Sequence, residues 1–145
     1  MARIFGEMRA RAFCHATEST ERVREALMFV AGEGETREDR AEGHHGNPIT
    51  VLSTVVDGTE GAERLLGMLD AESLREVAST LESRVDEACG LHLRFDKQEA
   101  YLGRLELSSG GDLVDVRIRI LAFPARQELA VEVARRYLED LSRSS

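Results

Sequence analysis

Arginine side chains at alternating positions are the first sign of chemistry in this sequence. Nineteen side chains are basic, and all but Lys97 are arginines. A guanidinium group can bind a phosphate through two parallel hydrogen bonds and can stack on an unpaired base. Three acidic residues share the solvent side of the same expected strands, so the arginines are in excess there. The pattern predicts an RNA-docking surface made of Arg9, Arg11, Arg94, Arg104, Arg117 and Arg119.

The acidic residues on that side allow a second interpretation. Cross-strand pairing of the arginines with Glu7, Glu106 and Asp115 would give a neutral surface without a ligand. Exposed rings for base stacking are not expected there, because the alternation turns Phe95 inward. Contact with RNA backbone or folded RNA is therefore favoured over the reading of single-stranded bases.

A polar elbow, Asp96-Lys97-Gln98 with Tyr101 nearby, offers a different chemistry. An aspartate, a lysine and a phenol could act in acid–base catalysis. In the structural alternative, Asp96 caps the short turn that follows, while Lys97 and Arg94 balance its charge. Lys97 and Gln98 are then expected to be flexible donors beside the arginine surface. No nucleotide-binding loop or nucleophile elbow is found, so a non-catalytic protein is expected.

Two histidines between glycines form a possible metal or ligand loop. Adjacent residues cannot easily coordinate one ion together, and no third ligand is suitably spaced, so neither a metal nor a cofactor is expected. Cys14 and Cys89 lie in apolar surroundings and are expected to be buried, reduced thiols. A loop tip that is exposed or touches a ligand is the expectation for Gly43, His44, His45, Gly46 and Asn47.

Composition limits the class of protein. A chain of 145 residues with 42% hydrophobic content is expected to form one domain, 1–145. The net charge of −8 disfavours indiscriminate binding to nucleic acid but allows a local basic surface. No apolar run is long enough to cross a membrane and the N-terminal sequence lacks a signal-peptide pattern, so a cytoplasmic location is expected.

Hydrophobic periodicity predicts the order β-α-β-β-α-α-β-β-β-α. Because strands and helices do not alternate regularly, the fold class expected is α+β: a two-layer sandwich with a mostly antiparallel sheet and helices on one face. The expected elements are a strand from Ile4 to Cys14, a helix capped by Thr17 and ended by Gly32, a loop or edge strand from Glu33 to Glu42, a strand from Ile49 to Val56, a helix capped by Thr59, a longer helix from Asp70 that ends before Gly90, strands at Leu91 to Asp96, around Leu105 and Leu107 and from Leu113 to Leu121, and a helix from Leu129 to Leu141.

Two segments carry a family resemblance that extends, in order, over essentially the whole chain. Gly46-Asn47-Pro48-Ile49 and the stretch from Arg94 to Gly103, RFDKQEAYLG, resemble a family of small uncharacterised archaeal proteins. The resemblance implies RNA binding, association with the exosome, and a fold similar to the large-subunit ribosomal protein that binds the small ribosomal RNA. A fold alone does not settle a function.

Two classes of function are therefore carried forward. The first is a non-catalytic RNA-binding protein, with a protein partner in an RNA-processing or degradation complex. The second is a protein-interaction module or homodimer of structural role. In that case the possible edge strand from Thr36 to Glu42 would pair with another chain.

Overall fold

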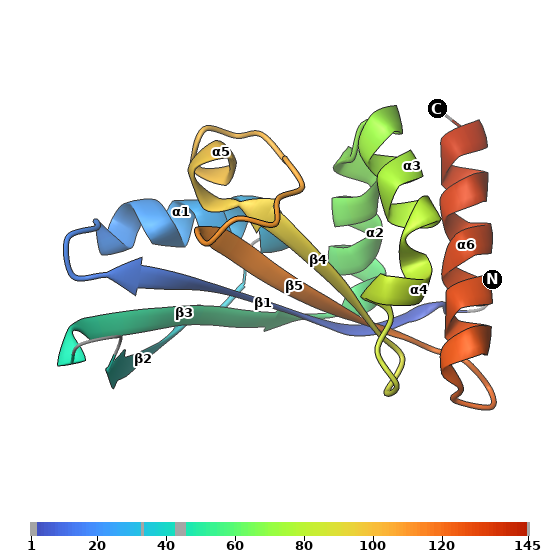
Figure 1. Ribbon diagram of the computed structural model, residues 1–145, viewed down its shortest axis with the longest axis horizontal. Coiled ribbons are helices and arrows are strands. Elements are labelled where there is room, and N and C mark those ends of the chain that lie inside the picture. The colour runs from blue at the N-terminus through green and yellow to red at the C-terminus, as the bar shows by residue number, and fades with distance from the viewer. Residues whose placement is uncertain (1–2, 33, 43–45, 145) are drawn as a thin grey trace. The chain divides into compact units, whose positions relative to one another are not determined.

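The computed structural model describes residues 3–32, 34–42 and 46–144. They form an α+β arrangement, as the periodicity predicts (Figure 1). The elements are β1 (Phe5–His15), α1 (Thr20–Ala31), β2 (Arg37–Glu42), β3 (Pro48–Val56), α2 (Gly58–Met68), α3 (Ala71–Ser79), α4 (Leu81–Arg84), β4 (Gly90–Asp96), α5 (Lys97–Tyr101), β5 (Leu113–Ile120) and α6 (Gln127–Arg143).

The strands form one antiparallel sheet in the order β2-β3-β1-β5-β4. The segment predicted to be a loop or an edge strand is the edge strand β2. It pairs with β3 from Arg37 opposite Ser53 to Glu42 opposite Pro48. Every residue of β2 is exposed and five of the six are charged, which is typical of an edge protected against pairing with other chains.

Packing divides the chain into two compact units. Unit 1 comprises residues 1–8, 57–93 and 117–145, and unit 2 comprises residues 9–56 and 94–116. Strands β1, β4 and β5 each contribute residues to both units.

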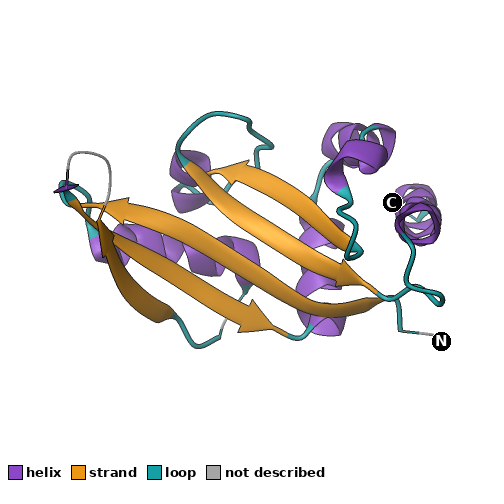
Figure 2. Ribbon diagram, turned by 60° about the horizontal axis from the view of Figure 1, so that its bottom comes forward, coloured by secondary structure: helices purple, strands orange, loops and turns teal. Residues whose placement is uncertain are grey.

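Unit 2 is built from an alternating strand and an amphipathic helix. Ala10, Ala12 and Cys14 of β1 are buried, as the alternation predicts. Helix α1 buries the predicted stripe Val23, Ala26, Leu27 and Val30, and it packs against β3. In the view of Figure 2, α1 lies behind the strands of this unit, and no helix of the described residues covers their side toward the viewer.

The two ends of α1 illustrate how well local signals work. Gly32 ends the helix at a positive φ of 89°, as predicted. The prediction that Thr17 caps the helix is wrong: Ser19 does so, and its side chain accepts a hydrogen bond from the Arg22 N–H. Both residues are good N-caps. The difference is that the chain makes a turn after His15, which delays the first helical residue to Thr20.

Unit 1 contains α2, α3, α4 and α6, with Phe5 of β1 packed edge-on against Tyr137 of α6 at 5.0 Å between ring centroids. Asp70 caps α3 as predicted, whereas α2 is capped by Asp57 and not by Thr59. The long helix expected after Asp70 is interrupted at Thr80. The Thr80 hydroxyl donates a hydrogen bond to the Glu76 carbonyl and so competes with the regular backbone hydrogen bonds of the helix.

The second strand expected around Leu105 and Leu107 does not form, and the short helix α5 takes its place in the order. Asp96 starts α5 because its carboxylate accepts a hydrogen bond from the Glu99 N–H at 2.9 Å. Gly103, at a φ of +83°, then reverses the chain. Only an isolated bridge between Phe95 and Leu107 remains of the expected pairing. Arg104 therefore lies on a loop and not on a strand.

Candidate functional site

Three of the six predicted arginines lie on strands of unit 2. Arg9 and Arg11 are exposed on β1, and Arg94 is exposed on β4. The Nε atoms of Arg11 and Arg94 lie 3.9 Å and 3.4 Å from the two carboxylate oxygens of Asp115 on β5. One carboxylate cannot neutralise two guanidinium groups. We call this surface, with Arg9, Arg11, Arg94 and Asp115, the arginine face.

The other three arginines lie on a loop of unit 2 or in unit 1. Arg104 pairs with Glu99 at 2.5 Å on the loop after α5. Arg117 and Arg119 belong to unit 1, and Arg117 donates two hydrogen bonds to Asp86. Arg104 and Arg117 are thus paired, but with Glu99 and Asp86 and not with the acids predicted. Of the predicted partners, Asp115 lies beside Arg11 and Arg94.

Phe13 is an exposed ring that the sequence interpretation missed. It follows Arg9 and Arg11 at the same spacing on β1, and 38% of the residue is exposed. The guanidinium carbon of Arg11 lies 5.6 Å from the centroid of its ring. The expectation that no aromatic side chain is exposed beside these arginines is therefore wrong. The signal was available, because the alternation that buries Ala12 and Cys14 must turn Phe13 outward.

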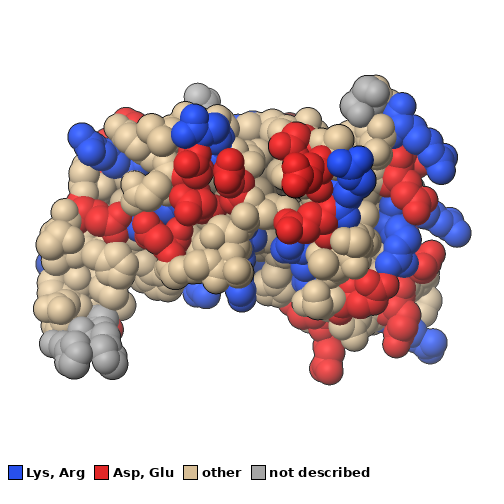
Figure 3. Space-filling view, turned by 45° about the horizontal axis from the view of Figure 1, so that its top comes forward, with Lys and Arg blue, Asp and Glu red and all other residues tan. Residues whose placement is uncertain are grey.

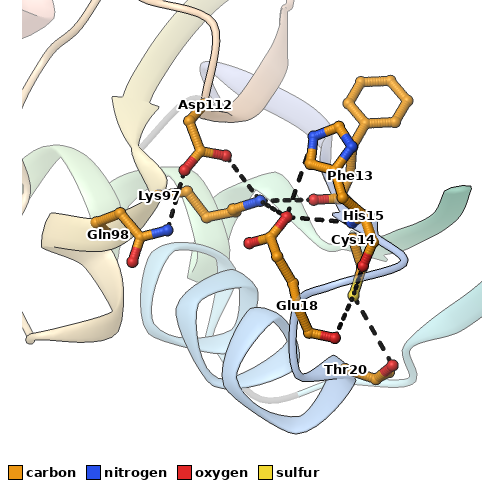
Figure 4. A network of polar contacts seen from close by, with 8 residues as sticks. All are labelled: Phe13, Cys14, His15, Glu18, Thr20, Lys97, Gln98 and Asp112. Carbon is orange, nitrogen blue, oxygen red and sulfur yellow. Dashed lines mark hydrogen bonds and ion pairs between the residues drawn. The ribbon is translucent and has the colours of Figure 1, made fainter. Parts of the chain in front are cut away.

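Lys97 lies in the interior of unit 2, which corrects its expected role as an exposed, flexible donor. Its ammonium group donates to the Phe13 carbonyl at 2.7 Å and to the Glu18 carboxylate at 2.9 Å (Figure 4). The Asp112 carboxylate lies 2.7 Å from the same nitrogen. Three acceptors match the three protons of an ammonium group. We call Lys97 and these three acceptors the lysine clasp.

The neighbours of the lysine clasp are also bonded. The Gln98 side chain donates a hydrogen bond to the Asp112 carboxylate at 3.0 Å, so this predicted donor already has an acceptor within unit 2. The carboxylate of Glu18 also accepts a hydrogen bond at 3.1 Å from the backbone N–H of His15, the last residue of β1. Burial alone would lower the pKa of Lys97, but its bonds with Asp112 and Glu18 outweigh that effect and raise it. The lysine therefore stays protonated and is not suited to act as a base.

His15, Glu18 and Asp112 bring their ligand atoms within 4.8 Å of one another, which suggests a metal site at first sight. The Lys97 ammonium contacts both carboxylates and supplies the positive charge that they require. The pKa of Asp112 illustrates this: burial would raise it, but the bonds from Gln98 and Lys97 lower it. We therefore assign Glu18 and Asp112 to the lysine clasp.

A groove of about 510 Å³ lies between α1 and α5, lined among others by Arg22, Lys97 and Tyr101. The guanidinium of Arg22 is 5.6 Å from the centre of the Tyr101 ring. Asp96 does not line the groove, because its carboxylate caps α5, the structural role expected for it. Of the acid–base set suggested by the elbow, Lys97 and Tyr101 line the groove and Asp96 does not.

The remaining predicted positions are outside this site or outside the described residues. Gly43, His44 and His45 lie outside the described residues. Gly46 has a positive φ of 74°, which explains the need for glycine, and Asn47 is exposed. Cys14 and Cys89 are buried free thiols, as expected. Within the described part of the chain, none of the helices has the length and apolar character that crossing a membrane requires.

Charges on the face drawn in Figure 3 are mixed. On the face in Figure 3, acidic side chains (red) and basic side chains (blue) are interspersed. Ion pairs such as Arg135 with Glu82 and Arg24 with Glu38 agree with this mixture. The arginine face differs because two of its guanidinium groups share a single acid.

Comparison with known proteins decides the family. The family described as RNA binding matches residues 7–120, which include both the arginine face and the lysine clasp. The chain belongs to this RNA-binding family. It is 37% identical over 142 residues to RNA-binding protein PAB1135 of Pyrococcus abyssi. The alignment covers 91% of this chain and 92% of that protein.

Solved structures agree with this assignment. Protein AF2318 of Archaeoglobus fulgidus matches with a TM-score of 0.81 and 35% identity, over 92% of this chain and 99% of that one. Mth689 of Methanothermobacter thermautotrophicus, a DUF54 protein, matches with a TM-score of 0.80 and 35% identity, over 94% and 99%. The predicted archaeal RNA-binding resemblance is thus confirmed. The exosome association and the likeness to a ribosomal protein stay predictions.

Proposed function

We propose that the protein is a non-catalytic RNA-binding protein that docks RNA on the arginine face of unit 2. The observation that carries this proposal is that Arg11 and Arg94 share the single carboxylate of Asp115. One negative charge faces two positive charges there, on an exposed surface of the sheet. Guanidinium groups at such a surface can exchange a weak carboxylate contact for a bidentate phosphate contact. Family membership supports the same class of ligand.

The overall acidity of the chain is compatible with this role. The net charge is −8, but salt screens charges beyond about 8 Å at physiological ionic strength. A phosphate at the arginine face therefore responds mainly to nearby charges, which include those of Arg9, Arg11, Arg94 and Asp115. The acidic remainder disfavours non-specific adhesion and leaves the local contact to provide affinity.

The absence of catalysis is part of the proposal. The lysine of the elbow is protonated and has three acceptors, and the aspartate beside it caps a helix. Neither group is arranged to take a proton from a substrate. Homodimer formation through β2 is the less favoured alternative, because its charged residues protect the sheet edge.

The test is a double substitution, Arg11→Gln with Arg94→Gln, measured by fluorescence anisotropy against a labelled oligouridine and a labelled RNA duplex. Affinity for both is expected to fall by at least about tenfold at low salt, because two phosphate contacts are lost. The slope of log K against log salt for the single strand should become shallower by about 1.4.

Arg104→Gln is the matched control, since Arg104 is exposed in the same unit but pairs with Glu99 on a loop. It is expected to bind like the unsubstituted protein. If the unsubstituted protein binds neither RNA at low salt, or if Arg104→Gln weakens binding as much as the double substitution does, the proposal is overturned.

A further inference from the structure

We propose that Phe13 is a stacking platform for an unpaired base, so that the preferred ligand of the arginine face is single-stranded RNA. This inference rests on the proposed function and specifies its substrate class. It also reverses the expectation from sequence, which favoured backbone contact or folded RNA because no exposed ring had been identified.

The position of Phe13 supplies the first argument. Its ring lies two residues beyond Arg11 on the same side of β1, and Arg11 already contacts it through a cation–π interaction at 5.6 Å. Phe13 is 38% exposed, and the outward residues on either side of it on β1 are polar, Arg11 and His15. A base that stacks on the ring would bring its phosphates to the guanidinium groups of the same strand.

The backbone of Phe13 supplies the second argument. Its carbonyl accepts a hydrogen bond from the buried Lys97 ammonium, and Glu18 holds both that ammonium and the His15 N–H. Figure 4 shows the Phe13 ring directed away from the clasp while its carbonyl points into it. The end of β1 is thus fixed from the interior side, and with it the backbone that carries the outward ring. A preorganised ring loses little entropy on binding.

The choice of single strands follows from geometry. Bases in a duplex are stacked on one another and are inaccessible to a side chain on a flat sheet. An unpaired base presents its face, and stacking on an aromatic side chain contributes about 1–3 kcal/mol per base. The arginines contact phosphates in either form of RNA, whereas the ring distinguishes between them.

The experiment compares Phe13→Leu with the unsubstituted full-length chain by anisotropy against labelled oligouridine and a labelled RNA duplex of equal length. Phe13→Leu is expected to weaken oligouridine binding by about tenfold while duplex binding stays unchanged. Phe13→Trp is expected to restore or exceed the original single-strand affinity. Thermal unfolding by circular dichroism verifies that both variants remain folded.

Phe123→Leu is the matched control. Phe123 is 85% exposed in unit 1, so its substitution also removes an exposed ring but not the one beside Arg11. It should not change either affinity. Ultraviolet cross-linking to oligouridine gives a second readout, with Phe13 expected as the attached residue.

The possible failures are distinguishable. Binding of neither RNA by the unsubstituted protein overturns the proposed function together with this inference. Binding of both RNAs, with Phe13→Leu changing neither affinity or reducing both equally, overturns the stacking platform alone. A folded Phe13→Trp that binds oligouridine no better than Phe13→Leu also overturns it.

Discussion

Each unit contains a charged side chain that is surrounded by hydrogen-bonding partners of the complementary kind, and the two charges have opposite signs. In unit 2 the cation Lys97 is surrounded by the acceptors of the lysine clasp. In unit 1 the anion Asp86 is surrounded by donors: it accepts hydrogen bonds from Arg117 and from the Ala88 and Gly90 N–H groups. His92 lies 2.7 Å from the same carboxylate.

The clusters differ in burial and in the distances along the chain that they connect. Only 3% of the Lys97 side chain is exposed, against 33% for Asp86. Lys97 bonds to residues 84 and 79 positions away, whereas two of the donors to Asp86 lie in its own turn. A buried charge that joins distant segments cannot be hydrated when its partners are lost. The comparison therefore predicts unequal costs of substitution.

The largest effect is expected for Lys97→Met. Methionine fills a similar volume but leaves two carboxylates facing each other and the Phe13 carbonyl without its donor. The free energy of unfolding, measured by urea titration, should fall by about 3 kcal/mol. Gln98→Met is the control one residue along, because Gln98 makes only an exposed bond to Asp112. If both variants lose the same free energy of unfolding, the hydrogen bonds of the lysine clasp do not contribute more to stability than an exposed one.

An intermediate effect is expected for Asp86→Asn, which keeps an acceptor for the backbone donors but loses the charge opposite Arg117. The free energy of unfolding at neutral pH should fall by about 1–2 kcal/mol. The control is Asp140→Asn, at an exposed position of α6 where no change is expected.

This second prediction also has a pH dependence with a definite sign. The hydrogen bond from Arg117, with those from Gly90 and His92, holds the pKa of Asp86 well below its ordinary 3.8 despite partial burial. A lowered pKa in the folded state stabilises the protein above the unfolded pKa, and that stabilisation is lost as the pH falls. The difference between the native protein and Asp86→Asn should therefore be constant above about pH 5 and shrink below about pH 4. A difference that grows in acid would refute the assignment.

The smallest effect is expected for Arg135→Gln. Arg135 on α6 pairs with Glu82 and Glu132, whose side chains are 67% and 56% exposed. Surface ion pairs contribute little because water and salt screen them. Urea titration should find no loss beyond experimental error. A loss as large as that for Asp86→Asn would mean that the backbone and guanidinium donors around Asp86 do not distinguish it from an ordinary ion pair.

Local signals predicted much of this fold. Alternation along β1 and β5 correctly placed the buried residues, Gly32 and Asp70 marked helix ends, and Asp96 was foreseen as a cap. The errors came where two local signals competed. Leu105 and Leu107 follow a strand pattern, but Asp96 and Gly103 instead direct the chain through α5 and away from the sheet.

In the candidate site, too, some features follow from local sequence signals and others do not. Alternation alone determined that Arg9, Arg11 and Phe13 share the outer side of β1, because successive side chains of a strand point to opposite faces. Only the tertiary structure decided that Asp115 serves both Arg11 and Arg94, and that Lys97 is buried among residues from distant parts of the chain. The side on which a residue lies is a property of its neighbours in sequence. The partner of a charge depends on which distant segments the packed core brings within hydrogen-bond distance.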